Sequence, residues 1–468
     1  MFHLNETITT ERGITMVKDM TSGSPAKLIL AFSIPLLIGN IFQQLYSMVD
    51  TIIVGRFLGV QALAAVGSTG SLSFLVLGFV MGITSGFSVL VAQRFGAGDE
   101  RGLRHYVAMS VYLGLIISAI LTALTIYLTK PMLGLMNTPD DIFEDAAVYI
   151  IIIFAGILPT MFYNLLAGVL RALGDSKTPL YFLIISSVLN IVLDLFFIVN
   201  LHSGVAGAAY ATVISQAVSA VLCLIYMMKR FPILKFHKEE LPFSFQSAFR
   251  LMQVGIPMAL QFSITAVGTM ILQGAINSFG STVVGAYTAA CKAEQLATQP
   301  MVTFGATMAS YTGQNLGAGR MDRIRKGVNS CIIISCIFCI LGSLVVVFGG
   351  GFLVSLFITG DQPEVMAYAR EYLNTIAVFF IPLGLIFIYR NTLQGMGDGF
   401  MPMMAGVAEL AMRAFVAFYL AGKLGYLGIC LAGPIAWLGA DVPLMITYYI
   451  RMHKIKKLEK EKGVIYAD

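Results

Sequence analysis

Apolar runs of about 20 residues recur along the whole chain, and this is the length that an α-helix needs to cross a bilayer. Hydrophobic residues make up 57% of the 468 residues and charged residues 12%, whereas soluble domains carry about 25% charged residues. Backbone inside lipid must satisfy its own hydrogen bonds, and a helix does so within one segment. The sequence therefore predicts an all-α membrane protein that crosses the bilayer many times.

Twelve apolar runs are predicted to span the membrane. They cover residues 28–54, 62–92, 103–128, 146–170, 179–200, 205–228, 249–277, 282–311, 327–350, 367–391, 401–421 and 427–450. A polar stretch divides them into two sets of six. The predicted segments are an N-terminal segment at 1–26, a first bundle at 27–228, a linker at 229–248, a second bundle at 249–450 and a basic tail at 451–468.

The distribution of basic residues predicts the orientation. If the N-terminus lies inside, the outer loops hold only four of the 30 Lys and Arg residues: Arg56, Lys130, Arg370 and Lys423. An excess of Lys and Arg in the inner loops is the usual topology signal of membrane proteins. We therefore expect a multi-pass protein of the cell membrane with both termini in the cytoplasm. The same signal explains the net charge of +5 without nucleic acid as a partner.

The two halves of the chain repeat each other. Gln93-Arg-Phe-Gly-Ala-Gly-Asp99 recurs 221 positions later as Gln314-Asn-Leu-Gly-Ala-Gly-Arg320. Pro159 and Pro382 are related by an offset of 223. Because each half has an even number of spans, both halves begin on the same side, and a pseudo-two-fold axis along the membrane normal relates them. A site between two such bundles is typical of a secondary transporter. No ATP-binding motif accompanies it, so an ion gradient is the expected energy source.

The first span carries a carboxylate, which is costly inside a membrane and marks a functional site by default. This residue is Asp50, and Gln43 and Tyr46 lie on the same helical face by their spacing. Pro35 lies near the other end of the span, where a proline kinks a helix. We expect Gln43 and Tyr46 to line a substrate cavity or take part in coupling, and Pro35 to act as a hinge. A static kink for packing is the alternative for Pro35.

Two further spans supply partners for this acid. Asn190 and Asp194 are four residues apart in the fifth span, and Thr212 lies in the sixth. Asp50, Asp194 and Thr212 each lie about 8 to 11 Å from the outer end of their spans, at 1.5 Å per residue. Two carboxylates, an amide and a hydroxyl suit a small cation, either H⁺ or Na⁺. The alternative is that backbone or water satisfies each of these side chains separately.

The second half carries different charges. Glu294 lies near the middle of its span, where it either attracts a cationic substrate or pairs across helices with Arg413 or Lys292. Glu409 and Arg413 are spaced i, i+4, which predicts an ion pair within one helix. A structural role is expected for this pair, with a role in coupling as the alternative.

No enzyme or cofactor site is indicated. The six cysteines fall inside apolar runs without metal-ligand spacing, and the five histidines are scattered at or beyond the ends of the spans. We therefore expect no metal beyond a Na⁺ at Asp50 and Asp194, no cofactor and no catalytic residues.

The chain resembles the multidrug and toxic compound extrusion (MATE) family. The resemblance is carried by the twelve spans, the Gly-Ala-Gly turns, Ile34-Pro35 with Gln43-x-x-Tyr46-x-x-x-Asp50, and Arg171-Ala-Leu-Gly-Asp-Ser-Lys-Thr-Pro179. It implies a V-shaped pair of bundles and cation-coupled export of amphipathic, often cationic, drugs. The protein is then expected to act as a monomer on small-molecule substrates.

One branch of that family keeps its cation site in the N-terminal half, and the resemblance carries that site onto Asp50, Asn190, Asp194 and Thr212. Another branch uses acids in spans seven and ten, whereas span seven and the middle of span ten (379–386) have no acid here. A lipid-linked-precursor flippase of the same superfamily is the alternative function. It predicts a basic cavity that holds pyrophosphate, whereas the first-half charges are acidic.

Overall fold

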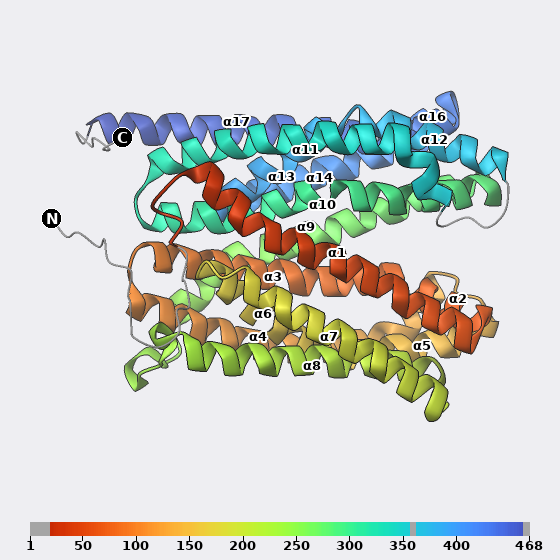
Figure 1. Cartoon of the computed structure of the whole chain (residues 1–468), viewed down its shortest axis with the longest axis horizontal. Helices are drawn as coiled ribbons and strands as arrows, with labels where there is room; N and C mark the ends of the chain where they lie inside the picture. The colour runs from red at the N-terminus through yellow and green to blue at the C-terminus, as the bar shows by residue number, and fades with distance from the viewer. Residues whose placement is uncertain (1–18, 356–361, 462–468) are drawn as a thin grey trace.

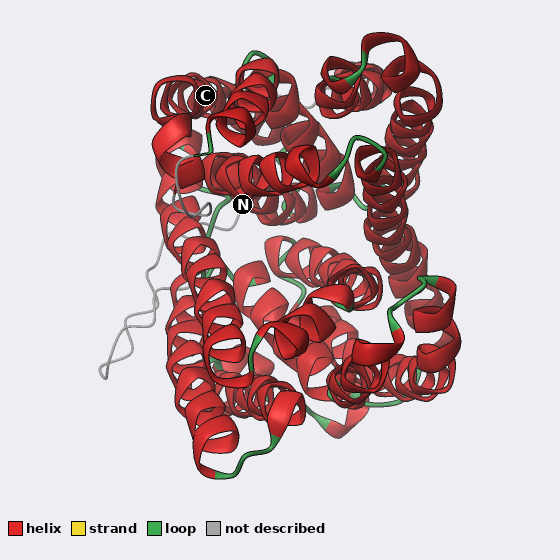
Figure 2. Cartoon of the chain, turned by 90° about the vertical axis from the view of Figure 1, so that its right-hand side faces the viewer, coloured by secondary structure: helices red, strands yellow, loops and turns green. Residues whose placement is uncertain are grey.

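A computed structural model describes residues 19–355 and 362–461. Within these ranges every regular element is a helix (Figure 2). The described part of the chain begins and ends at the left of Figure 1, and most helices run along the long axis. We call this end of the molecule the terminal end, and the opposite one the distal end. The predicted segments 1–26 and 451–468 lie partly outside the described residues.

The first half of the chain forms the lower set of helices in Figure 1. It comprises α1 (Pro25–Leu58), α2 (Val60–Ser68), α3 (Gly70–Gly96), α4 (Glu100–Leu135), α5 (Asp140–Ala155), α6 (Ile157–Ala172), α7 (Lys177–Leu195), the π-helix η1 (Phe196–Asn200) and α8 (Gly204–Arg230). Two short 3₁₀-helices follow, η2 (Pro232–Leu234) and η3 (Lys238–Glu240).

The second half forms the upper set. It comprises α9 (Phe245–Asn277), α10 (Ser281–Gly317), α11 (Met321–Ser355), α12 (Pro363–Ala377), α13 (Phe380–Gly395), α14 (Phe400–Phe415), the π-helix η4 (Val416–Leu420), α15 (Ala421–Leu424), α16 (Tyr426–Cys430) and α17 (Ala432–Glu461).

The helices account for the predicted spans. Among the described residues nine helical segments are long and apolar enough to cross a membrane, and the bent pairs α5–α6 and α12–α13 raise this number to eleven. The twelfth is α10, which has 37 residues and carries polar side chains such as Lys292 and Glu294 along its length. The fold is the predicted one: twelve transmembrane helices in two bundles, which meet near the terminal end and diverge toward the distal end as a V (Figure 1).

The internal repeat extends to breaks in the backbone. The α5–α6 pair is bent by 47° and the α12–α13 pair by 54°. The sequence predicted two single spans here, at 146–170 and 367–391. Pro159 and Pro382 fall in the first turns of α6 and α13, where a missing N–H is tolerated because the first turn has no intrahelical acceptors for it. The π-helices η1 and η4 also occupy matching places, one after α7 and the other after α14.

Helices α3 and α9 join the two bundles through direct backbone contact. Gly78, Gly82 and Gly86 repeat every four residues, a spacing that lets helices in membranes approach closely. A Cβ atom added at Gly82 would lie 2.5 Å from the Cα of Ala259, and one added at Gly86 would lie 2.5 Å from the Cα of Gly255. The glycines are therefore required for this arrangement of the bundles.

We expect Gly86→Ala to disfavour the described arrangement of the bundles. Overpacking costs about 1–3 kcal/mol, which is a shift of roughly 5- to 150-fold in the equilibrium between this arrangement and one with the helices apart. Spin-label distances between the bundles in the purified protein measure the shift. Gly349→Ala is the matched control, because a Cβ there meets no atom within 4 Å. An unchanged distance distribution in Gly86→Ala would contradict the expectation.

The first helix of each half begins in the core of the other bundle. Ile29 and Phe32 of α1 pack with the core of the second half, and Leu251 and Met258 of α9 pack with the core of the first half. The distal part of α1 returns to the first bundle, where Val54 packs against α2 and α8. Helices α1 and α9 thus cross between the bundles, which the predicted segments did not anticipate.

Pro35 lies in the part of α1 that contacts the second bundle. The hydroxyl groups of Ser33 and Thr307 are 2.7 Å apart, and Asn40 Nδ2 donates to Thr303 Oγ1 at 3.0 Å. Helix α1 is continuous from Pro25 to Leu58, so the hinge role of Pro35 stays a prediction.

The linker is fixed to α4. Arg104 Nε donates to Glu240 Oε2 at 2.7 Å, and the guanidinium holds the pKa of this carboxyl below its ordinary value. The ring nitrogens of His105 contact Glu240 O and Ser247 Oγ, both at 3.0 Å. The polar segment 229–248 therefore packs on the first bundle instead of extending away from it.

Candidate functional site

Four predicted site residues of the first bundle meet where α1, α7 and α8 converge. The carboxyl groups of Asp50 and Asp194 lie within hydrogen-bonding reach of each other. With its amide oriented to satisfy both ends, Asn190 donates to Asp194 Oδ2 at 2.9 Å and accepts from the Thr212 N–H at 3.2 Å. Asn190 is 1% exposed and Asp194 is fully buried. The structure thus brings together the side chains that spacing and depth placed at one level. We call Asp50, Asn190, Asp194 and Thr212 the acid cluster.

Two carboxylate oxygens of the acid cluster lack a partner. Asp50 Oδ1 and Asp194 Oδ1 are buried and accept no hydrogen bond from the described residues. A buried acceptor without a partner is costly, and two neighbouring carboxylates repel each other when both are ionised. A proton or a small cation bound between them removes both penalties. The donor set of two carboxylates, an amide and a hydroxyl fits either H⁺ or Na⁺.

Two tyrosines border the acid cluster. The Tyr46 hydroxyl is within hydrogen-bonding reach of Thr212, so this predicted cavity residue lies beside the cluster. Tyr149 of α5 lies close to Asp50, Tyr46 and Asp194 and was missed by sequence reasoning, since a single tyrosine in an apolar run carries no signal of its own. Gln43 is exposed on α1, and the structure does not join it to the cluster by a hydrogen bond among the described residues.

The second bundle contains a buried group of charges that carries its own cations. Glu409 binds Arg390 through one oxygen and Arg413 through the other, the latter at 3.3 Å. All three side chains are buried. The predicted pair of Glu409 and Arg413 is therefore confirmed, whereas Arg390 of α13 was missed. It lies at the end of a predicted span, where a basic residue looks like an ordinary topology signal. We call Arg390, Glu409 and Arg413 the arginine cluster.

Glu294 has a neutral partner. The Tyr372 hydroxyl donates to Glu294 Oε2 at 2.7 Å, and the rings of Tyr287 and Tyr372 meet edge to face at 4.9 Å. Lys292 is exposed, and neither it nor Arg413 forms an ion pair with Glu294 within the described chain. No cation of the described chain therefore contacts the Glu294 carboxyl group.

The pseudo-symmetry gives the two bundles opposite charges at related places. Tyr149 and Tyr372 are related by the repeat offset of 223, and each lies beside a membrane acid. Asp194 lies two residues before η1, whereas Arg413 lies three residues before η4. A guanidinium thus lies in the second bundle near the place where the first bundle has an acid. Of the two, the acid cluster is the one with unpartnered acceptors for a mobile cation.

The described residues do not indicate a metal site or a disulfide. They contain no group of three or more His, Cys, Asp or Glu side chains placed to hold a metal ion. The six cysteines are free thiols. The described part of the chain therefore offers the two clusters, Glu294 and Asp441 of α17 as sites of buried charge in the membrane; Asp441 is buried and its Oδ1 lacks a partner.

Comparisons with known proteins agree with the fold and the repeat. The model of the MatE family matches residues 35–196 and again residues 257–419, one match for each half. The "Probable multidrug resistance protein YpnP" of Bacillus subtilis is 31% identical over 446 residues, which cover 95% of this chain and 99% of that protein. The "Probable multidrug resistance protein YoeA" of the same organism is 30% identical, with coverage of 92% and 94%.

Solved structures show the same architecture. The structure described as "Outward-facing conformation of a multidrug resistance MATE family transporter of the MOP superfamily" superimposes with a TM-score of 0.87 at 25% identity, covering 95% of this chain and all of that one. The relatives are named as multidrug resistance proteins and the solved structure is described as a transporter, in agreement with the prediction that the chain is not an enzyme. Because the family model matches both halves and the similarity covers nearly the whole length, the chain belongs to the MatE family of multidrug and toxic compound extrusion transporters.

Proposed function

We propose that this protein is a cation-coupled antiporter that exports amphipathic, often cationic, organic compounds by alternating access. The observation that carries the proposal is the pair of neighbouring carboxylates at Asp50 and Asp194, each with a buried oxygen that lacks a partner. The pair lies in one bundle of a two-bundle transporter, apart from the contact between the bundles. The names of the relatives as multidrug resistance proteins support the substrate class.

The proposed location is the cell membrane, with the terminal end in the cytoplasm and the protein acting as a monomer. The basic residues support this orientation, because Arg320, Arg323 and Arg325 all lie at the terminal end. In membrane proteins, Lys and Arg accumulate on the cytoplasmic side. The segments 27–228, 229–248 and 249–450 are kept as the proposed bundles and linker, with α1 and α9 crossing between the bundles.

Coupling runs through α1 in this proposal. A cation that enters from outside binds Asp50 and Asp194 and removes their repulsion. The same helix is hydrogen-bonded to the second bundle through Ser33 and Asn40. A movement of the distal half of α1 therefore also moves the part of α1 that contacts the second bundle. The cation drives the cycle only through its different affinity for the outward-open and inward-open states.

Glu294 is the proposed attractor for cationic substrates. Its partner Tyr372 is neutral, so no cation of the described chain occupies the carboxyl group, which is left to a cationic substrate, with Gln43 and Tyr46 on the opposite bundle as further candidates. A flippase of lipid-linked precursors would need free cations for a pyrophosphate. The buried Arg390 and Arg413 both bind Glu409, which favours the drug exporter.

The test is transport by the purified protein in liposomes loaded with an amphipathic cationic dye such as ethidium. We expect an imposed H⁺ or Na⁺ gradient to drive dye movement in the opposite direction. Separate H⁺ and Na⁺ gradients at zero membrane potential identify the coupling ion. Dye movement that ignores both gradients would overturn the coupling, and movement of a labelled lipid pyrophosphate in place of dye would favour the flippase.

A further inference from the structure

Two glutamines related by the internal repeat each reach across to the other bundle. Gln93 Nε2 of α3 donates to the Gly395 carbonyl at 3.0 Å, and Gln314 Nε2 of α10 donates to the Ala172 carbonyl at 2.8 Å. The acceptors are the last residues of α13 and α6, and they too are related by the repeat offset, here 223. The two hydrogen bonds are therefore equivalent under the pseudo-two-fold axis.

Each glutamine satisfies a backbone carbonyl at the end of a helix in the other bundle. The last carbonyls of a helix have no intrahelical donor, and a buried carbonyl without a partner is costly. Gln314 is fully buried, so water does not compete freely for its amide. Each bundle thus caps the C-terminal end of a helix in the other bundle. Both hydrogen bonds break together if the two bundles separate at the terminal end.

Two glycines bring the backbones into contact at the same place. A Cβ atom at Gly96 would collide with the carbonyl oxygen of Gln314, and one at Gly317 would collide with that of Gln93. The repeated Gln-x-x-Gly sequences therefore cross each other directly. We call Gln93, Gly96, Gln314 and Gly317 the terminal latch.

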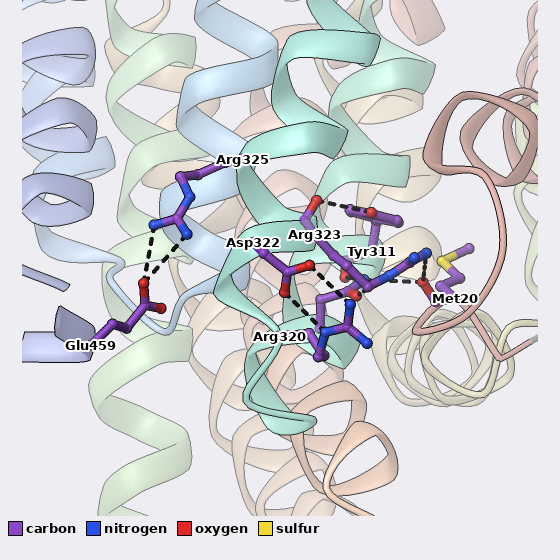
Figure 3. Close-up of polar contacts among 8 residues, drawn as sticks. Met20, Tyr311, Arg320, Asp322, Arg323, Arg325 and Glu459 are labelled. Carbon is purple, nitrogen blue, oxygen red and sulfur yellow. Dashed lines mark hydrogen bonds and ion pairs between the residues drawn. The ribbon is translucent and has the colours of Figure 1, made fainter. Parts of the chain in front are cut away.

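The N-terminal segment adds an asymmetric contact to the terminal latch. Gln314 Oε1 accepts a hydrogen bond from the Met20 N–H at 2.9 Å. The Met20 carbonyl in turn accepts from Asn315 Nδ2 and Arg323 Nη2, each at 3.2 Å. Figure 3 shows Met20 beside Arg323 at this end of the second bundle. The Gln314 amide therefore links the first bundle, the second bundle and the segment that leads into α1.

We propose that the terminal latch holds the transporter closed on its cytoplasmic side in the outward-open state and releases once in every transport cycle. This rests on the alternating access and the orientation proposed above. Both hydrogen bonds and both glycine contacts join the bundles, and none lies within a single bundle. Two neutral hydrogen bonds of this kind stabilise the closed arrangement enough to populate it, yet they are weak enough to open reversibly.

The experiment measures how far the terminal ends separate, without gradient or substrate. Spin labels are placed at Lys177→Cys and Lys454→Cys, two exposed sites at the terminal end, in a background with the six native cysteines replaced by alanine. Gln93→Leu and Gln314→Leu are each expected to raise the ratio of open to closed terminal ends about fivefold, and the double variant is expected to raise it further than either single variant. Gln253→Leu, on an exposed glutamine of α9, is the matched control and is expected to leave the ratio unchanged.

Distance distributions that stay at the wild-type ratio in the double variant would overturn the latch. If a leucine variant does not fold, Gln93→Asn and Gln314→Asn keep the amide but shorten its reach by one methylene, and the same shift is expected. Failure of the proposed function is distinguishable, because a wild-type protein that moves no dye in liposomes still shows the shift if the latch is correct.

Discussion

The rate of gradient-driven export by the Asp50→Asn variant is expected to be about 5- to 150-fold lower than that of the wild type, which is the usual range of coupling between two sites. Asparagine keeps the size of the side chain but carries no negative charge and takes up no proton. The acid cluster then loses the repulsion between Asp50 and Asp194 that a bound cation relieves. In the variant, the cation is expected to bind both states of the transporter with equal affinity, so it no longer shifts the equilibrium between them. Asp194→Asn is expected to have the same effect, because the two carboxyl groups act as one site.

Dye export from liposomes under an imposed gradient measures the loss, and dye binding in detergent shows that the substrate site is intact. Asp145→Asn is the matched control, since Asp145 is an exposed acid on α5 near the same distal end. Export at the wild-type rate in both Asp50→Asn and Asp194→Asn would show that the acid cluster is structural. Loss of dye binding along with export would indicate a substrate role instead of coupling.

The Glu409→Gln variant is expected to be destabilised by about 3–5 kcal/mol, the usual result of removing one member of a buried ion pair. Two buried guanidinium groups, Arg390 and Arg413, would then lose the carboxylate that binds both of them. Thermal unfolding of the purified protein in detergent measures the loss, together with the yield of monodisperse protein. Glu371→Gln, on an exposed glutamate of α12, is expected to unfold like the wild type.

A triple variant separates structure from function in the arginine cluster. Replacing Arg390, Glu409 and Arg413 together by methionine removes every charge, and such apolar replacements are often neutral or stabilising. We expect the triple variant to recover most of the stability lost in Glu409→Gln. Export at the wild-type rate would confirm the structural role, whereas a folded variant without export would show that the cluster takes part in coupling. A wild-type unfolding temperature in Glu409→Gln would contradict the buried pairing itself.

Helical periodicity and span length predicted that the members of the acid cluster lie at one level of the membrane. Asn190 and Asp194 share a face because they are four residues apart, and the length of each span set the depth of Asp50 and Thr212. The pairing of Glu409 with Arg413 follows from the same i, i+4 rule and is present in the structure. Each of these relations lies within one helix or depends on distance from a membrane surface, so the order of residues determines it.

Partners from other helices could not be predicted in this way. Tyr149, Tyr372 and Arg390 each complete a site from a helix distant in sequence. Which face of one helix meets which face of another depends on how every helix of the bundle is rotated and packed. A single tyrosine or arginine in an apolar run gives no indication of that rotation.

The sequence by itself determined the membrane location, the twelve spans, the two-fold repeat and the level of the acids, because apolar length and helical spacing are local properties. Only the tertiary structure decided that α1 and α9 cross between the bundles and that Gln93 and Gln314 bind helix ends in opposite bundles. The repeated Gln-x-x-Gly sequences were visible from the start. Their meaning depends on contact between two segments more than 200 residues apart, which packing between the bundles creates.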